Sequence, residues 1–383
     1  MHERSEDKLC GKGPIWMPSR FDTGVAALQQ CGRLAPVEGC GGGNAVTDPE
    51  HIMQVGMGFL ASKTLLSAVE LGVFTELASQ TDSADGLGER LGLHVRGRRD
   101  FLDGLVALGF LEREGDGPDA VYSNAGDSAV FLDRNQPTYI GGILEMANAR
   151  LFRFWADLTE ALRTGDPQNE IKASGRPMFD ELYADPARLE QFMHAMAGIS
   201  AGSFHALAEK FDFSRYATLS DVGGATGLLS TIVAQRHPHL RCTSCDLPVV
   251  RPIAERAIAA AGVADRVSAV DLDFFADPIL PADVVTMGLI LHDWNLEKKM
   301  HLIRAAYDAL PEGGAFIVVE NLIDDARREN VFGLMMSLNM LIEFGDAFDY
   351  TGANFAGWCH EVGFRDIEIM PLAGPASAGI AYK

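Results

Sequence analysis

From residue 217 to the C-terminus, short apolar runs alternate with longer segments of helical spacing. Short runs bounded by glycine, proline or charged residues are typical of buried strands, whereas apolar residues three or four positions apart indicate amphipathic helices. The expected strands lie at 217–222, 240–246, 267–271, 283–291, 315–320, 366–370 and 379–383. This alternation predicts an α/β fold with a doubly wound, mostly parallel seven-stranded sheet. Only residues 371–378 join the last two strands, which favours an antiparallel pair.

The preceding part of the chain is helical in pattern, with one predicted hairpin. The expected elements are helices at 51–77, 83–91 and 98–111 and strands at 110–114 and 120–123. A Gly-Asp-Gly sequence at 115–117 separates the two strands, as is typical of a tight turn. Two helices followed by a hairpin form the pattern of a winged helix, which serves either to dimerise or to bind DNA.

Three segments follow from these patterns. Residues 1–46 lack sustained periodicity and contain a glycine cluster, so we expect a disordered extension. Residues 47–165 are expected to form the winged-helix unit, and residues 166–383 the unit with the sheet. Within the second unit, 166–215 carries long apolar stripes at helical spacing, which indicate helices that pack in the core and contribute to a substrate pocket.

The composition narrows the possible partners. With 383 residues, 47% of them hydrophobic, the chain is expected to form two globular domains. A formal net charge of −21 opposes nucleic-acid binding and favours dimerisation as the role of the winged helix. The N-terminus lacks a secretory signal pattern, and we expect no apolar run long enough to span a membrane. A cytoplasmic protein without membrane contact is therefore expected.

The six cysteines give little support for a metal site. Cys242 and Cys245 form a lone C-x-x-C inside a predicted strand, and two further ligands at a matching spacing are not evident. We therefore expect no metal.

A glycine-rich turn follows the first predicted strand and opens a helix. Residues 221–227 read Asp-Val-Gly-Gly-Ala-Thr-Gly, and glycines at such a turn allow a ligand to approach the backbone. A dinucleotide site begins similarly, but its later glycines would fall on Ala225 and Leu228. The leading Asp221 favours a methyl donor, and a structural turn without any ligand is the simplest alternative.

Carboxylates also follow the next two predicted strands. Asp246 ends the second strand, where a carboxylate can accept hydrogen bonds from both hydroxyls of a ribose; a helix cap before Pro248 is the alternative. After the third strand, Asp273 is placed to bind an adenine amine and Phe274 to stack on the ring. Turn formation and core packing explain these last two residues equally well.

A histidine is predicted at the C-terminal end of the fourth strand, the end at which open α/β sheets bind ligands. A neutral imidazole at His292 can take the proton from an attacking hydroxyl, although a lone histidine is often only structural. Two carboxylates are candidates for holding this imidazole in the right tautomer: Glu320, which ends the fifth strand, and Asp349.

With these four motifs in order, the chain from about residue 48 onward resembles the plant-type class I family of S-adenosylmethionine-dependent O-methyltransferases, which has many bacterial members. The resemblance implies a Rossmann-like methyltransferase domain, a winged-helix dimerisation domain and thus a homodimer. It places His292 on the catalytic base, Glu320 on one flanking carboxylate and, more loosely, Asp349 on the other. The implied reaction is in-line methyl transfer to a hydroxyl of a small aromatic or polyketide-like acceptor.

The resemblance also implies which residues bind the two substrates. Donor contacts are expected from Asp221, Gly223, Gly224, Asp246, Leu247, Asp273, Phe274, Gly288 and Trp294. Acceptor contacts are expected from Phe179, Phe192, Met193, Met196 and Met340. Two positions depart from the family pattern. At Ala225 the family commonly has glycine, and the methyl group of alanine is tolerated there if its φ is negative. At Gly288 many relatives have lysine, so the contact to the donor is either made by the backbone or lost.

Three alternatives stay open from the sequence. Some proteins of this resemblance bind the donor but hydroxylate or decarboxylate polyketides. The acceptor atom can also be nitrogen or carbon, and nitrogen acceptors often need no base. Finally, the winged helix would suit a DNA-binding regulator, whose binding would depend on salt.

Overall fold

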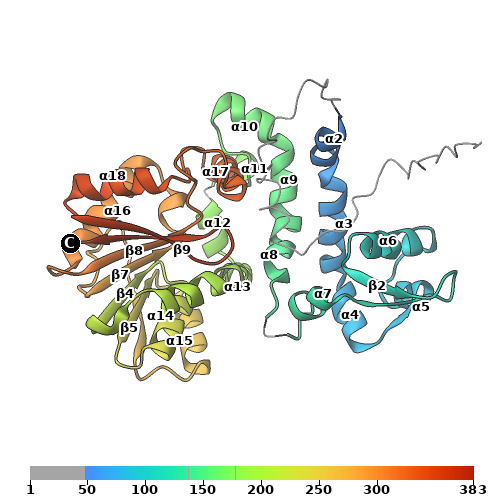
Figure 1. The fold of residues 1–383 in the computed structure, drawn as a ribbon, viewed down its shortest axis with the longest axis horizontal. Helices are drawn as coiled ribbons and strands as arrows, with labels where there is room; N and C mark the ends of the chain where they lie inside the picture. Colours follow the sequence, from blue (N-terminus) through green and yellow to red (C-terminus); the bar gives the residue numbers. More distant parts are fainter. Residues whose placement is uncertain (1–47, 137, 177) are drawn as a thin grey trace, which may run out of the picture.

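The computed structural model describes residues 48–136, 138–176 and 178–383. The expectation of disorder for residues 1–46 therefore lies outside the described residues. Figure 1 shows a sheet-bearing part and a smaller helical part, with α3 and the continuous helical run of α8 and α9 between them.

The helical part begins with α2 (Glu50–Gly56), α3 (Gly58–Leu71) and α4 (Val73–Ser79). The sequence predicted one helical stretch here, but Gly72 at φ +75° ends α3 in a left-handed cap. Next come α5 (Ala84–Arg90), α6 (Val95–Ala107) and the hairpin of β2 (Leu111–Glu114) and β3 (Val121–Asn124), extended by β1 (Asp82–Ser83). The helix predicted to reach residue 111 ends earlier because Gly109 takes φ +80°. The predicted order of two helices and a hairpin is confirmed.

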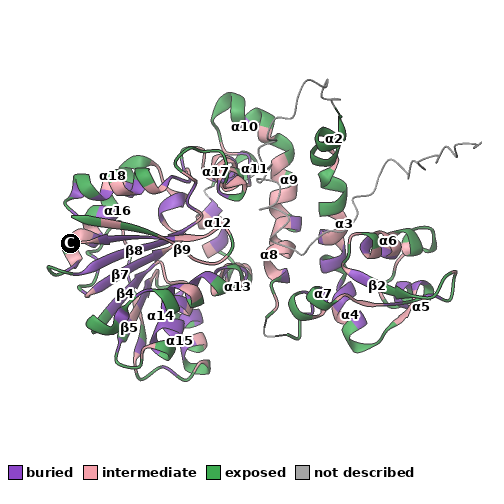
Figure 2. Ribbon diagram, in the orientation of Figure 1, coloured by how far each residue is buried: buried purple, intermediate pink, exposed green. Residues whose placement is uncertain are grey.

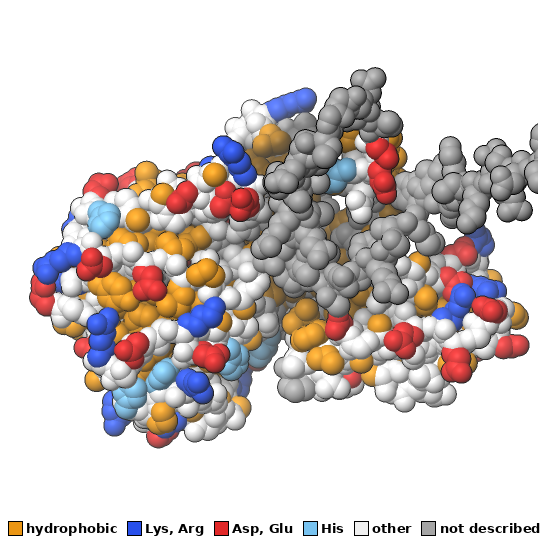
Figure 3. Space-filling model, viewed as in Figure 1, with side chains coloured by type: hydrophobic (Ala, Val, Ile, Leu, Met, Phe, Trp, Pro, Cys, Tyr) orange, Lys and Arg blue, Asp and Glu red, His pale blue; other side chains and the backbone are white. Residues whose placement is uncertain are grey.

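The basic side chains around α6 are paired with carboxylates of the same part. Asp103 binds both Arg99 (3.4 Å) and Arg113 (2.6 Å), and Arg96 pairs with Asp100 one turn along the helix. On the face shown in Figure 3, acidic and basic side chains are interspersed over both parts. Such pairing favours a solvated helix face over a surface for phosphates, which requires unpaired cations.

A series of short helices leads from the hairpin to the sheet. They are α7 (Gly126–Phe131), α8 (Gly141–Met146), a π-helical turn (Ala147–Leu151), α9 (Phe152–Phe154), α10 (Leu158–Thr164), α11 (Ile171–Ser174), α12 (Met178–Tyr183) and the long α13 (Pro186–Lys210). Helix α8 contacts both α3 and α13 and so connects the two parts.

The seven-stranded sheet has the order β6-β5-β4-β7-β8-β10-β9. Its strands are β4 (Thr218–Val222), β5 (Arg241–Asp246), β6 (Val267–Asp271), β7 (Val284–Gly288), β8 (Ala315–Glu320), β9 (Asp366–Pro371) and β10 (Ser377–Tyr382). Strands β4 to β8 are parallel, and β10 lies antiparallel between β8 and β9. The predicted fold class and the final antiparallel pair are confirmed.

Helices cover both faces of this sheet. Helices α14 (Leu228–Arg236) and α15 (Arg251–Ala260) pack on one face, and α16 (Leu296–Ala309) and α18 (Gly352–Val362) on the other. Side chains of successive strand residues point to opposite faces of the sheet, so that Val284 packs on one face and Val285 on the other. The central strands are accordingly buried throughout (Figure 2). Because five strands run parallel, the motifs that follow them meet at one edge.

The stretch Glu50–Leu71 is apolar but largely exposed in the single chain. Ile52, Val55 and Phe59 are 73%, 66% and 52% exposed. By length and composition alone this stretch passes as a membrane span, with a mean hydropathy of 1.3, so the expectation of no such run is wrong. Helices that pack against a protein partner can be as apolar as helices that span a membrane, because a protein interface and a lipid bilayer are both apolar environments.

Candidate active site

One cavity of about 1890 Å³ opens at the C-terminal ends of the parallel strands. Helices α12 and α13 and α17 (Val331–Phe344) contribute to its wall. That wall includes all nine predicted donor residues, all five predicted acceptor residues and His292. Glu320 and Asp349 are not in the wall but lie buried next to His292.

The glycine turn after β4 accepts no side chain at its first two positions. Gly223 has φ +70°, and a Cβ atom there would lie 2.3 Å from Cδ1 of Ile290. A Cβ atom on Gly224 would lie 2.2 Å from Oγ of Ser244. Glycine is therefore required at both positions, and the bare backbone forms part of the cavity wall.

Ala225 departs from what the sequence predicted. Its φ is +50°, in the left-handed region, so the expected negative φ is wrong. A residue with a Cβ atom costs roughly 1–2 kcal/mol in this conformation. The turn holds it there because the backbone N–H of Ala225 donates to Oδ2 of Asp246 at 2.9 Å.

The two carboxylates near this turn differ in their partners. Asp246 accepts from the N–H groups of Ala225 and, at 2.8 Å, Leu247, and burial raises its pKa. Asp221 accepts from Thr286 Oγ1 at 2.8 Å and from Ser230 Oγ at 3.3 Å, and burial raises its pKa to about 7. Asp221 thus ties β4 to β7 and α14, whereas Asp246 is half-buried and lines the cavity.

Aromatic rings flank the same end of the cavity. Phe274 and Trp294 meet at 6.2 Å between centroids, and Phe179 stacks on Trp294 at 6.3 Å. The indole N–H of Trp294 is buried without a hydrogen-bond partner, so a ligand can satisfy it. Asp273 accepts from the N–H of Phe275 at 3.0 Å, which accounts for its position in the turn.

Gly288 ends β7 against an aromatic ring. A Cβ atom there would lie 3.1 Å from Cε1 and Cζ of Phe204. The ring of Phe204 thus takes the space beside Gly288.

His292 lies in a turn and not on the strand itself. The strand predicted to reach residue 291 ends at Gly288, because Leu289 takes φ +55° and the chain turns into a 3-10 segment (Leu291–Asp293). The N–H of Leu291 donates to the side-chain Oε1 of Glu320 at 3.0 Å, in place of a further backbone hydrogen bond between β7 and β8. Glu320 therefore fixes the turn that presents His292.

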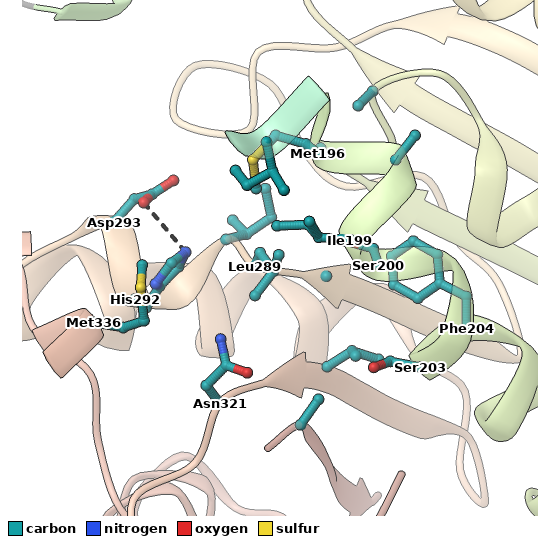
Figure 4. Close-up of a pocket in the computed structure, with 18 of the residues that line it drawn as sticks. Met196, Ile199, Ser200, Ser203, Phe204, Leu289, His292, Asp293, Asn321 and Met336 are labelled. Carbon is teal, nitrogen blue, oxygen red and sulfur yellow. Dashed lines mark ion pairs between the residues drawn. The ribbon is translucent and has the colours of Figure 1, made fainter. Parts of the chain in front are cut away.

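The imidazole is buried among three carboxylates. Its Nδ1 lies 3.4 Å from Oδ1 of Asp349, and its Nε2 lies 3.3 Å from Oδ1 of Asp293 (Figure 4). Burial alone would lower the pKa of His292, but Asp293, Glu320 and Asp349 together raise it to about 10. The surrounding carboxylates thus favour the protonated imidazole in the ligand-free protein.

Among the described residues, only His292, Glu320 and Asp349 group closely enough to suggest a cation site, with ligand atoms within 4.8 Å of one another. Two positive groups lie close enough to these carboxylates to attract them. They are the imidazolium of His292 and the ammonium of Lys299, whose Nζ donates to the carbonyl of Phe348 at 2.8 Å. The chain's own cations thus offset part of the negative charge of this centre.

Three residues of this site were missed by the sequence reasoning. Asp293 follows His292 directly. Asn321 projects into the cavity (Figure 4), and its side chain has no hydrogen-bond partner among the described residues. Lys299 is fully buried. A signal for it existed, because residue 299 falls on the apolar stripe formed by Leu302, Ile303 and Ala306.

Comparison with known proteins gives consistent matches along the chain. A model of the O-methyltransferase domain matches residues 155–365, and a model of the O-methyltransferase dimerisation domain matches residues 53–134. The tetracenomycin polyketide synthesis 8-O-methyl transferase TcmO of Streptomyces glaucescens is 41% identical over 338 residues, which are 88% of this chain and 98% of TcmO. The N,N-dimethyltransferase OxyT of Streptomyces rimosus is 34% identical over 320 residues, 84% and 92% of the two chains. The crystal structure of human N-acetylserotonin methyltransferase with SAM is 26% identical, with a TM-score of 0.81 over 89% of this chain and 99% of the human one.

Proposed function

Because this chain belongs to the O-methyltransferase family, we propose that it moves the methyl group of S-adenosylmethionine onto a hydroxyl of a small aromatic or polyketide-like molecule, with His292 as the base. One observation carries the proposal. A single apolar cavity joins the glycine turn after β4 to a buried histidine flanked by carboxylates. A donor and an acceptor bound in this cavity would lie next to each other.

The donor is assigned to the end of the cavity with the glycine turn. Asp246 accepts the ribose hydroxyls, the Phe274 ring faces the adenine, and the bare backbone of Gly223 and Gly224 lets the amino-acid part approach. The orphaned indole N–H of Trp294 fits a polar group of the donor. When bound, S-adenosylmethionine supplies a methyl group that its sulfonium charge already activates.

The acceptor is assigned to the end lined by α12, α13 and α17. Phe179, Phe192, Met193, Met196 and Met340 hold a flat apolar ring, and the amide of Asn321 offers a polar contact. Holding the acceptor oxygen in line with the methyl group can contribute roughly 7–11 kcal/mol. As the oxygen–carbon bond forms and the carbon–sulfur bond breaks, the hydroxyl proton passes to His292, and the product is S-adenosylhomocysteine.

The base must be neutral when it acts. His292 therefore loses its resting proton before the transfer, and Asp349 and Glu320 then hold the imidazole and stabilise the proton it receives. The positive charge of the bound donor favours that loss, since like charges repel.

A homodimer is part of the same proposal. The exposed apolar side chains of α2 and α3 lie in the segment matched by the dimerisation model, and a second copy would bury them. We place the domains at 47–165 and 166–383 and expect a cytoplasmic protein that does not bind DNA, in keeping with its net charge of −21.

Transfer to nitrogen is the second candidate, favoured by the similarity to an N,N-dimethyltransferase. An amine attacks as its neutral form and often needs no base. Removal of His292 would then have little effect on the rate.

The test is methyl transfer from labelled S-adenosylmethionine to matched acceptors, 1-naphthol and 1-naphthylamine, with product identification by mass spectrometry. We expect the O-methyl product, at an unchanged rate in EDTA, because the proposed mechanism uses no metal. Methylation of the amine alone would overturn the proposal in favour of the second candidate. Binding of the donor with oxidation or loss of CO₂ from an aromatic acid would favour the non-methylating alternative.

A further inference from the structure

Lys299 is a charged side chain in the interior of the protein. It lies in the first turn of α16, and its exposed fraction is 0%. Burial of an ammonium group without partners is strongly unfavourable, so its surroundings must favour the charge.

The partners of Lys299 come from two separate loops. Its Nζ donates to the carbonyl of Trp294, in the loop that carries His292, and to the carbonyl of Phe348, next to Asp349. The Phe348 ring lies below it, with Nζ 3.7 Å from the centroid. Lys299 thus joins the segment with the imidazole to the segment with its carboxylate.

A second bond of α16 joins the same two segments. Asn295, which caps the helix, donates from Nδ2 to Oδ2 of Asp346 at 2.8 Å. The start of α16 therefore sets the spacing between the loop at 291–294 and the loop at 345–350.

The charges facing Lys299 are those that surround His292. Burial lowers the pKa of Lys299 to about 8, while Glu320, Asp349, Asp293 and Asp346 act to raise it. The Tyr350 ring lies 5.7 Å from Nζ, and Glu343 acts on Asp293 from α17. At neutral pH the ammonium is charged, so it offsets part of the negative charge that holds the proton on His292.

We infer that Lys299 is a positioning residue: it fixes the loops of His292 and Asp349 at their spacing, and its charge makes the proton of His292 easier to remove. The inference rests on the proposed role of His292 as base. Without Lys299, three carboxylates would act on the imidazole unopposed, and the neutral form would become rarer at any given pH.

Two variants separate the charge from the hydrogen bonds. Lys299→Met removes both, whereas Lys299→Gln keeps a donor without a charge. Arg304→Met is the control, because Arg304 lies on the same helix but donates to the carbonyl of Val362. Binding of S-adenosylhomocysteine and the melting temperature establish that each variant is folded.

The readout is kcat against pH at saturating substrates. Below pH 8, where Lys299 is charged in the parent, we expect the acid limb to lie about one pH unit higher in both Lys299 variants, a size typical of one nearby charge, and thus kcat to be about tenfold lower there. Arg304→Met should leave the limb in place. A lower kcat with an unmoved limb in both folded Lys299 variants would overturn the inference and leave Lys299 a structural role only.

A charge-compensated variant covers the case in which the single variants do not fold. Lys299→Met with Glu320→Gln removes one charge of each sign, and glutamine keeps the oxygen that accepts from Leu291. We expect a folded protein whose acid limb lies near that of the parent. A limb displaced upward by about one unit would contradict the inference. Failure of the proposed function is distinguishable, because His292→Ala would then transfer at the parent rate.

Discussion

The two ends of the cavity are built by different means. The donor end consists mainly of backbone at 223–227 and of side chains at or just after the ends of β4, β5 and β6, each placed by its own strand and turn. The histidine end combines a turn after β7, the end of β8, the loop at 345–350 and the start of α16, and it is held together by buried charges.

This difference predicts how each end responds to change. Backbone geometry at the donor end depends mainly on φ angles and on the absence of side chains. The histidine end depends on the balance between carboxylates and two cations, so removing one charge alters the others. Predictions that separate the two ends test this contrast directly.

The largest expected effect is the loss of the base. His292→Ala should lower kcat by about 10²–10⁴-fold, the usual contribution of a general base, and leave the affinity for S-adenosylhomocysteine unchanged. Methyl-transfer rates report on the histidine end of the cavity, and calorimetric affinities for S-adenosylhomocysteine report on the donor end. His194→Ala, on an exposed position of α13, is the control. Weakened donor binding in His292→Ala would show that the two ends are not independent.

The pH dependence comes next in size. Because the pKa of His292 is raised to about 10 and the base acts when neutral, kcat/KM should rise with pH between 7 and 9. The slope should approach tenfold per pH unit, so the rise can reach about 100-fold. Affinity for S-adenosylhomocysteine should change little between pH 8 and 9, above the pKa of Asp221. A rate independent of pH would exclude proton removal by His292.

The smallest effect concerns the strained turn at the donor end. Ala225→Gly should relieve the left-handed strain, and part of the gain is lost to the freedom of glycine in the unfolded chain. We expect a net stabilisation of up to about 1 kcal/mol in denaturant unfolding. The same change at the exposed helical residue Ala259 should destabilise by about 1 kcal/mol. An equal loss of unfolding free energy in Ala225→Gly and Ala259→Gly would mean that the backbone of Ala225 is not strained.

The contrast also explains what the sequence could predict. The strands and the donor residues could be found because each depends on its neighbours: a buried run, a glycine turn, an acid at a strand end. The end of β7 was placed wrongly because Leu291 bonds to the side chain of Glu320, a partner distant in sequence. For the same reason Asp349 could be proposed only as one of two candidate partners of His292, and Lys299 was missed, since its carbonyl partners lie on two loops.

Calorimetric titration with S-adenosylhomocysteine tests the central claim, that the glycine-turn end of this cavity binds the methyl donor. The parent should bind with a micromolar Kd, and Asp246→Ala should bind about 10- to 100-fold more weakly, as expected for lost hydrogen bonds to a charged group. Asp271→Ala, opposite Asp246 on β6, should bind as the parent does. Absence of binding in the parent, or equal binding in Asp246→Ala, would contradict the account.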